Sequence, residues 1–400
     1  MQLFRLAPVL LAITSMVVAA PTAMSKGVDV HIIERDAAPA EMIVDVQKRD
    51  AAANAAAEAI ADNTAAAIQN LIDLLNPANF DLLKFSEALI SFFLSPVTQI
   101  LPVRLAATLL PKIDLAANFI ISKTFIPNKA IPGYGKIFTA PNVDKGRIGW
   151  FVEAKDRTPD DPVILYAHGG GYLVGFLPPF IWISNAIYSA LGNNRLSILL
   201  LDYTLTLDKV FPQQLIEFTE TFNQLSKTSN NIILMGDSAG GHLCLQFLRH
   251  QNYKQFSGVV AANTSAATTG GIFLSPWVNV YPDPNDGTFK TNYGKDYLTA
   301  RLMQHGTEVN LPERWMYTDP AFNMYKDAID WDSFLPPKVF VSRGENEVLY
   351  DSIGDWTELA GFDGNDTLFT DPDGVHDSAV LVQEDSDIIP EIITYLRDIL

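Results

Sequence analysis

The sequence has one cysteine, few basic residues and no spacing typical of a metal site. Cys244 alone cannot form an intramolecular disulfide, so packing must stabilise the fold. Lys and Arg number 28 against 46 Asp and Glu, which gives a formal net charge of -18 without any basic cluster, so no nucleic-acid partner is expected. No arrangement of His, Cys, Asp and Glu along the chain suggests a metal site, and no metal is expected either.

Long apolar runs are also scarce. The run from Leu6 to Ala20 carries no charge, but it is shorter than the roughly 20 residues that a membrane span needs. Arg5 precedes this run and small residues end it, which predicts a signal peptide over residues 1–19. We therefore expect a secreted protein with no stable membrane span. The alternative is an uncleaved N-terminal segment that anchors the protein to a membrane.

The segment after the predicted signal peptide ends in a dibasic pair. Lys48-Arg49 is typical of a kexin-type processing site and predicts a propeptide over residues 20–49. Two sequons, which begin at Asn263 and Asn365, would accept glycans in a secreted chain. The mature protein is thus expected to be a glycoprotein that begins at Asp50.

The rest of the chain divides into a helical front and an alternating part. Apolar residues at helical spacing in residues 50–135 predict an N-terminal helical cap region. Residues 136–400 alternate strand-like runs with helical patterns, which predicts an α/β fold with a mostly parallel central sheet and helices on both faces. Residues 281–335 interrupt this alternation and are expected to form a cap insertion. The expected strands are 147–153, 163–167, 196–201, 232–235, 271–275, 338–342 and 367–370.

A serine between two glycines follows one of these strands. The run "NIILM" continues directly into "GDSAGG", so Ser238 stands between Gly236 and Gly240 where a strand is expected to turn into a helix. Gly-x-Ser-x-Gly in this context holds the serine on a strained turn and leaves its side chain free to act as a nucleophile. The structural alternative is a glycine-rich helix start that packs closely on the sheet.

A serine nucleophile needs a base, and the base needs an acid to orient it. Among the six histidines, only His376 lies late in the chain in a loop after a strand. His242 follows Ser238 by one helical turn and is expected to be a packed polar residue. Three carboxylates follow the strand at 338–342 and are candidates for the acid: Glu345, Glu347 and Asp351. The order serine, acid, histidine along the chain is that of α/β-hydrolases.

Three consecutive glycines follow the strand at 163–167. The segment "HGGG" begins at His168, and glycines at a strand end let bare N–H groups approach a ligand closely. In an α/β-hydrolase this turn supplies part of the oxyanion hole, so we expect Gly169 and Gly170 to donate N–H groups together with Ala239. His168 is expected to shape the turn and to transfer no proton.

These motifs resemble those of the hormone-sensitive-lipase-like family of α/β-hydrolases. The resemblance rests on "HGGGY" at 168–172, "GDSAGG" at 236–241 and the segment from "LDYTLT" to "FPQQL", and it covers about residues 136–400. Within the family, "RGENEVLYDS" and "GVHDS" look most similar to fungal steryl acetylesterase relatives. The resemblance implies a serine esterase without a cofactor and with a helical cap over the site. The family's Asp-Pro-Leu acid motif appears here as Glu347-Val348-Leu349, which implies Glu347 as the acid, with Asp351 as the alternative.

We interpret the chain as a serine hydrolase that cleaves carboxylic esters of apolar substrates through an acyl-enzyme. Short-chain, acylglycerol and steryl esters are the candidate substrates. Three aromatic residues near the motifs are expected to line the substrate site: Tyr172, Phe176 and Trp277. One alternative is a lipid or sterol carrier that keeps the fold without catalysis, and another is an amidase or peptidase of the same fold. Loss of the nucleophile or the base would mark a carrier, and both are present.

Overall fold

The computed structural model describes residues 69–70, 73–76, 80–94, 113–126, 130–253, 256–263, 267–381 and 386–400. The predicted signal peptide and propeptide, residues 1–49 with Lys48-Arg49, lie outside these ranges. Among the described residues, no helix has both the length and the apolar character of a membrane span.

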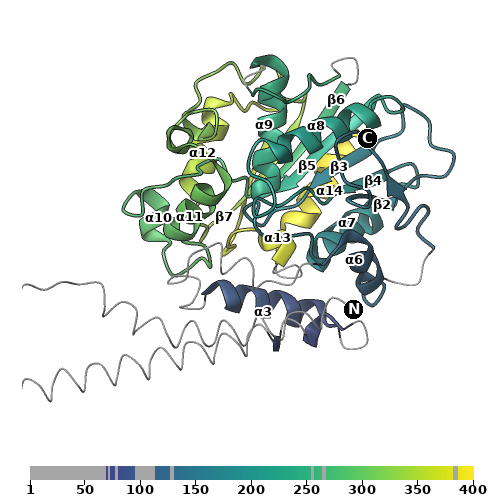
Figure 1. Ribbon diagram of the computed structural model, residues 1–400, viewed down its shortest axis with the longest axis horizontal. Coiled ribbons are helices and arrows are strands. Elements are labelled where there is room, and N and C mark those ends of the chain that lie inside the picture. The colour runs from purple at the N-terminus through teal and green to yellow at the C-terminus, as the bar shows by residue number, and fades with distance from the viewer. Residues whose placement is uncertain are drawn as a thin grey trace, which may run out of the picture.

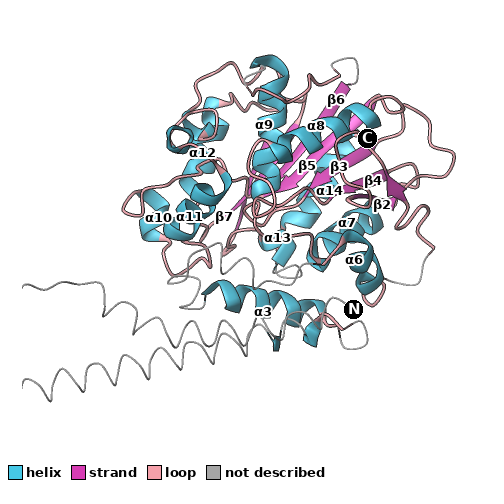
Figure 2. Cartoon of the chain, viewed as in Figure 1, coloured by secondary structure: helices cyan, strands magenta, loops and turns pink. Residues whose placement is uncertain are grey.

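A single sheet forms the centre of the molecule (Figures 1 and 2), and the described part of the chain contributes eight strands to it in the order β1-β2-β4-β3-β5-β6-β7-β8. β2 pairs antiparallel with β1 and β4, and every other pairing is parallel. This confirms the prediction of an α/β fold with a mostly parallel sheet. Each predicted strand segment overlaps a strand, whereas the two-residue β1 was not predicted. The strands are β1 (Ile137–Phe138), β2 (Ile148–Val152), β3 (Val163–Ala167), β4 (Ser197–Leu201), β5 (Asn231–Asp237), β6 (Ala267–Leu274), β7 (Val339–Gly344) and β8 (Thr367–Asp371).

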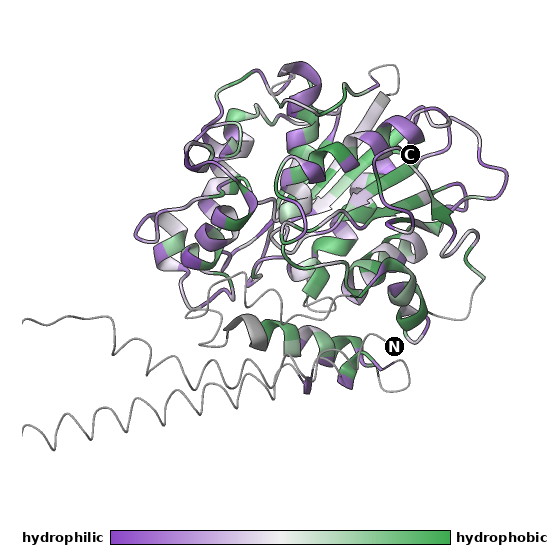
Figure 3. Ribbon diagram, viewed as in Figure 1, coloured by the Kyte–Doolittle hydropathy of each residue, from purple (hydrophilic) through white to green (hydrophobic). Residues whose placement is uncertain are grey.

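Alternate residues of the central strands build two separate cores, one on each face of the sheet. On β3, Val163 and Leu165 belong to one core and Ile164 and Tyr166 to the other, and all four are fully buried. A strand that is covered on both faces has apolar residues throughout, which is why these segments read as continuous apolar runs in the sequence. Figure 3 shows hydrophobic strands in the centre and more hydrophilic helices in the insertion.

Helices cover both faces, as predicted. One face packs against α8 (Gln213–Leu225), α9 (Ala239–Tyr253) and α12 (Tyr350–Leu359), and the buried Cys244 lies on α9. The other face packs against α7 (Pro178–Leu191), α13 (Ser378–Leu381) and α14 (Ile388–Ile399). The layered arrangement brings the carboxyl ends of the parallel strands to one edge of the sheet, where sites of open α/β folds lie.

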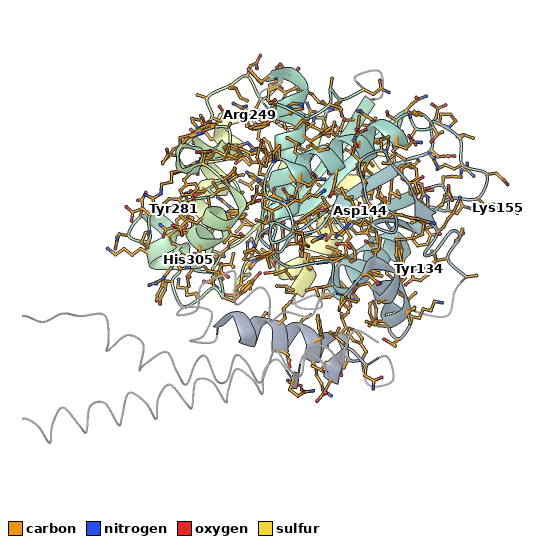
Figure 4. All side chains as sticks on the ribbon, in the orientation of Figure 1. Tyr134, Asp144, Lys155, Arg249, Tyr281 and His305 are labelled. Atoms are coloured by element: carbon orange, nitrogen blue, oxygen red, sulfur yellow. The ribbon has the colours of Figure 1, made fainter. Side chains whose placement is uncertain are left out.

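Two regions predicted as parts of a cap have different places in the fold. In the N-terminal region 50–135, the described helices α3 (Leu82–Leu94) and α6 (Leu115–Ser122) pack on α13 and α7 (Figure 1). The segment 281–335 lies between β6 and β7, and Tyr281 and His305 in it are labelled in Figure 4. Its elements are α10 (Gly287–Thr291), α11 (Ala300–Asn310), η2 (Arg314–Tyr317) and η3 (Met324–Lys326).

Candidate active site

Ser238 occupies the sharp turn between β5 and α9. Its φ of 46° lies in the left-handed region, which is costly for a residue with a side chain. Three backbone hydrogen bonds hold this conformation: the N–H of Ser238 donates to Leu274 (2.8 Å), and its carbonyl accepts from Trp277 and His242 (3.0 Å each). The strained turn is therefore anchored by the neighbouring strand β6 and by the first turn of α9.

The glycines around Ser238 permit a very close approach of backbone to backbone. A Cβ atom on Gly240 would lie 2.0 Å from the carbonyl oxygen of Ala167, and one on Gly236 would lie 2.4 Å from the carbonyl of Gly240. Real contacts never approach this closely, so neither position accepts a side chain without movement of the backbone. The glycine-rich start of α9 therefore also packs closely on the sheet, as the structural alternative predicted. This packing brings the serine turn close to the end of β3.

The structure brings Ser238, His376 and Glu347 into one hydrogen-bonded chain. His376 lies in the loop after β8, with Nε2 at 2.8 Å from the Oγ of Ser238. The Nδ1 of the same ring lies 2.6 Å from Oε1 of Glu347, in the turn after β7. Since the three residues come from segments that follow β5, β7 and β8, the sheet itself sets their spacing.

Glu347 is fixed by donors on its second carboxylate oxygen. Oε2 accepts from the N–H of Gly344 (2.9 Å) and from the hydroxyl of Ser275 (3.0 Å), and the residue is completely buried. The alternative acid, Asp351, is exposed at the start of α12, where its carboxylate accepts from the N–H of Thr288 (2.9 Å). Only Glu347 of the candidate acids therefore contacts the imidazole.

Burial and neighbouring charges act in opposite directions on the pKa of His376. Desolvation lowers this pKa, but the carboxylates of Asp377 and Glu347 raise it more, so that it lies above the ordinary value of 6.5. Asp296, also buried beside this group, has its pKa raised to about 6, mainly by desolvation. The site is thus an acidic environment in which the cationic form of the imidazole is stabilised.

The turn "HGGG" corrects one part of the predicted oxyanion hole. The N–H of Gly169 donates to the buried carboxylate of Asp237 (2.9 Å), so it is not available to a substrate oxygen. Among the described residues, the amides of Gly170, Gly171 and Ala239 donate to no protein acceptor. A Cβ on Gly171 would meet nothing within 4 Å, which shows open space at this point of the turn. Gly171 therefore replaces Gly169 among the candidate donors.

Asp237 explains why the sequence misled at this position. Its second oxygen accepts from the hydroxyl of Tyr166 (2.6 Å), and a Cβ on Gly169 would lie 2.2 Å from the carboxylate. The carboxylate thus bonds the glycine turn to the residue that precedes Ser238, and the two bonded residues are 68 positions apart in the sequence. No local pattern in "HGGG" reports such a long-range acceptor.

The two histidines near the motifs are structural. His168 stacks on Tyr203 at 4.2 Å between ring centroids and donates from Nδ1 to the carbonyl of Gly169 (2.7 Å). His242 points away from the nucleophile, with Nδ1 at 2.7 Å from the hydroxyl of Tyr172 and Nε2 at 3.3 Å from the carbonyl of Phe322. Burial lowers the pKa of His242 to about 4, so this ring is neutral at physiological pH.

The predicted aromatic lining of the substrate site also needs correction. Phe176 is fully buried and packs in the core against His168 and Phe180, so it offers no surface to a ligand. Tyr172 and Trp277 lie next to each other, with ring centroids 6.4 Å apart, and are 3% and 4% exposed. They form an aromatic wall that is not open to solvent, and the backbone N–H of Trp277 links it to the carbonyl of Ser238.

Helix α11 of the insertion lies over this wall. A Cβ on Gly306 would lie 3.4 Å from the Trp277 ring, so the missing side chain lets the helix pack directly on the indole. A small apolar cluster joins α11 to the turn after the glycines and to the segment after β4: Leu173, Leu207, Leu302 and Val309. Ser238 itself is only 7% exposed, so little of the nucleophile is open to solvent.

The first part of the insertion holds the turn that carries the acid. The side-chain amide of Asn292 donates to the carbonyl of Glu347 (2.9 Å), and Asp296 accepts from the N–H of Val348 (2.9 Å). The hydroxyl of Thr288 donates to the carbonyl of Val348 (2.9 Å). Sequence reasoning missed these residues because nothing local indicates that the insertion returns to this turn.

The last part of the insertion is fastened to α9, the helix that begins beside Ser238. Gln246 donates to the carbonyl of Ala321 (2.5 Å), and Arg249 forms a buried ion pair with Asp327 (2.6 Å). Figure 4 labels Arg249 at this end of the molecule. Both ends of the insertion are thus bonded to segments that carry active-site residues.

The described residues contain no cluster of three or more His, Cys, Asp or Glu that could hold a metal ion.

Comparison with known proteins identifies the family. A sequence profile described as steryl acetyl hydrolase matches residues 92–389, most of the chain. The chain belongs to the steryl acetyl hydrolase family. Steryl acetyl hydrolase 1 of Saccharomyces cerevisiae is 31% identical over 235 residues, and the mug81 protein of Schizosaccharomyces pombe is 32% identical over 245 residues. These matches cover 52% and 58% of this chain and 51% and 63% of the two relatives, so the chain spans about half to two thirds of their length.

Solved structures confirm the α/β-hydrolase fold of this steryl acetyl hydrolase family member. An esterase of the bacterial hormone-sensitive lipase family aligns with a TM-score of 0.53 at 22% identity, over 77% of this chain and 98% of that one. A fungal esterase from Rhizomucor miehei aligns with a TM-score of 0.56 at 20% identity, over 75% and 91%. The resemblance read from the sequence motifs is therefore confirmed at the levels of family and fold.

Proposed function

We propose that this chain is a serine hydrolase that cleaves carboxylic esters through an acyl-enzyme. The observation that supports this most directly is the hydrogen-bonded chain from the strained Ser238 through His376 to the buried Glu347. Membership of the steryl acetyl hydrolase family supports the same reaction class. The order serine, acid, histidine on this fold is the order of α/β-hydrolases.

Each residue has a role that follows from its contacts. Nε2 of His376 accepts the hydroxyl proton while the Oγ of Ser238 attacks the ester carbonyl, and the same nitrogen then protonates the departing alcohol. Glu347 holds the proton on Nδ1 and stabilises the imidazolium. The free amides of Gly170, Gly171 and Ala239 are the donors for the negative oxygen of the tetrahedral intermediate. Water then attacks the acyl-enzyme in the reverse sequence and releases the carboxylic acid.

The proposed substrate is an acetyl ester of a sterol or of a similarly bulky apolar alcohol. The family description and the name of the Saccharomyces cerevisiae relative support this choice over acylglycerols. The apolar cluster of Leu173, Leu207, Leu302 and Val309 under α11 is suited to an apolar alcohol and not to a charged one. The near-complete burial of Ser238 is compatible with a small acyl group.

A substrate series tests the proposal. Purified protein is incubated with p-nitrophenyl esters of increasing acyl length, with a steryl acetate and with the matched acetamide, and Ser238→Ala is the control. Fastest turnover of acetyl esters, including the steryl acetate, is the expected result. Faster cleavage of the amide would favour an amidase, and sterol binding without turnover by either protein would favour a carrier.

We also propose that the protein is secreted after removal of residues 1–19 and cleavage behind Lys48-Arg49. The uncharged run before Ala20, the dibasic pair and the exposed sequon residue Asn365 support this. Edman sequencing of protein from the culture medium should give Asp50 as the first residue, and glycosidase treatment should lower its apparent mass. Retention of Met1 in a membrane fraction would instead support the anchored alternative.

A further inference from the structure

A second carboxyl group lies beside the nitrogen that contacts the nucleophile. Oδ2 of Asp377 is 3.3 Å from Nε2 of His376, the atom that is also 2.8 Å from the Oγ of Ser238. Glu347, in contrast, contacts the opposite nitrogen of the ring. Asp377 is therefore on the side of the imidazole where protons are exchanged with the reacting oxygens.

The carboxyl group of Asp377 has no evident structural task. Its backbone holds the loop: the N–H donates to Ser275 (3.2 Å) and the carbonyl accepts from Val380 and Leu381 (2.9 Å each). No described N–H caps the side chain, and Oδ1 is buried without any hydrogen-bond partner among the described residues. A buried polar atom without a partner is costly, and it is usually explained by a ligand or water that the site holds.

The surroundings of Asp377 are acidic. The charges of Asp237, Glu347 and Asp296 act on its carboxyl group, and the hydroxyls of Tyr166 and Tyr297 lie within reach of its charge. Among the described residues that act on it, only His376 becomes cationic. Burial, reinforced by the three carboxylates, raises the pKa of Asp377 well above its ordinary value. A carboxyl group in such a place is retained at a cost, which favours a functional role over a structural one.

The reaction itself defines what must stand next to Asp377. The departing alcohol oxygen takes its proton from Nε2, and the hydrolytic water later gives a proton to the same atom, so each oxygen must lie within hydrogen-bonding distance of Nε2. A carboxyl group at 3.3 Å from the same nitrogen can therefore reach an oxygen that is bonded to Nε2 on that side. The water has two hydrogens, so one can be donated to Nε2 while the other needs a second acceptor. The departing alcohol oxygen receives its only hydrogen from Nε2 and needs no second acceptor.

We propose that Asp377 is a fourth catalytic residue, whose carboxyl group holds the water that hydrolyses the acyl-enzyme; this rests on the proposed esterase function. One hydrogen of the water points to Nε2 of His376, and the other is donated to a carboxyl oxygen of Asp377. When the water oxygen bonds to the acyl carbon, its first proton passes to Nε2. The bond between that carbon and the Oγ of Ser238 then breaks, and Nε2 returns the proton to the serine.

Three variants separate the role in the water step from a role in the fold. Asp377→Ala removes the acceptor, and Asp377→Asn keeps an acceptor oxygen while it removes the charge. Asp373→Ala is the matched control, because Asp373 belongs to the same loop and has a similar left-handed φ (56° against 54°) but is exposed. Circular dichroism and thermal unfolding check the fold of the full chain in each case.

The readouts are the rate at which a fluorophosphonate labels Ser238, which needs no water, and the turnover of p-nitrophenyl acetate with its pre-steady-state burst. Both rates are taken on the pH plateau of each protein, because loss of the Asp377 carboxylate also lowers the pKa of His376. There Asp377→Ala should label within about twofold of the wild type but turn over on the order of 10- to 100-fold more slowly after a full burst, as the loss of one hydrogen bond in the deacylation step predicts. Asp377→Asn should recover most of the turnover, and Asp373→Ala should match the wild type.

Wild-type turnover in Asp377→Ala would overturn the proposal. So would a parallel fall in labelling and turnover without recovery in Asp377→Asn, because that pattern belongs to a residue that only positions the loop. Failure of the esterase proposal looks different, since the wild type would then show neither turnover nor labelling that depends on Ser238.

Discussion

Replacing Glu347 by glutamine should disable the imidazole without removing any buried volume. Three donors converge on this carboxylate: the Nδ1–H of His376 on one oxygen, and the N–H of Gly344 and the hydroxyl of Ser275 on the other. A glutamine amide has only one acceptor oxygen, and its NH₂ group must face one of these donors. A backbone N–H cannot reverse its direction, but an imidazole can move its proton to the other nitrogen.

The amide oxygen should therefore turn to Gly344, and its NH₂ group should donate a hydrogen bond to the unprotonated Nδ1 of His376. The proton then sits on Nε2, which cannot take the proton of Ser238. By analogy with the serine-protease triad, loss of the correct tautomer lowers kcat by about 10⁴, or roughly 5 kcal/mol of transition-state stabilisation. Any donor left unpaired adds a cost of about 1–3 kcal/mol to the free energy of unfolding.

The assay compares kcat for p-nitrophenyl acetate and the urea unfolding curve of Glu347→Gln with those of Asp351→Asn. Asp351 is exposed and accepts from Thr288, and an asparagine keeps that acceptor, so this control should lose less than about threefold in kcat. A Glu347→Gln variant with kcat within tenfold of the wild type would refute the reasoning. A larger loss in Asp351→Asn would move the role of the acid to Asp351.

Three further outcomes are expected. Ser238→Ala should lower kcat by about 10⁶, as in comparable serine enzymes, and abolish fluorophosphonate labelling; undiminished labelling would exclude Ser238. Gly240→Ala should lower the free energy of unfolding by about 1–3 kcal/mol or more, because the added Cβ would clash with the carbonyl of Ala167. Gly364→Ala should be near neutral, because a Cβ at that position has no atom within 4 Å, and equal effects of the two substitutions would contradict the packing argument. Since catalysis needs neutral His376 and its pKa is raised, the acid limb of kcat/KM against pH should lie above pH 6.5, and a limb at or below 6.5 would contradict the stated charge environment.

The sequence allowed the fold to be predicted because its signals are local. Each parallel strand is covered on both faces and reads as an apolar run, and the serine elbow is written within six residues from Gly236 to Gly241. The antiparallel pairing of β2 and the existence of β1 could not be read, since pairing direction leaves no mark in one strand and two residues leave too short a pattern. The acid Glu347 needed the family resemblance, because three carboxylates in one turn look alike without a partner.

The parts that could not be predicted depend on contacts between distant segments. Gly169 was assigned as an oxyanion donor because the glycines are equivalent in the sequence, but the carboxylate of Asp237 selects this one amide. Phe176 looked like a lining residue because it follows the turn, yet its ring is directed into the core against Phe180. Asp377 follows His376 directly in the sequence, but only the three-dimensional arrangement shows that its carboxyl group lies near Nε2.

The attachment of the insertion at both ends limits how this enzyme scaffold can be recombined with its relatives. A chimera that exchanges the whole of residues 281–335 would discard Asn292 and Asp296, which grip the turn of the acid, and Asp327, which neutralises Arg249 on α9. Such a chimera would show poor catalysis or misfolding because these contacts are missing, and its activity would not report the substrate specificity of the exchanged segment. Splice points after Thr299 and before Ala321 would instead transplant α11 and η2 alone, so the covering helix could be varied as an exchangeable module while the reactive groups keep their supports.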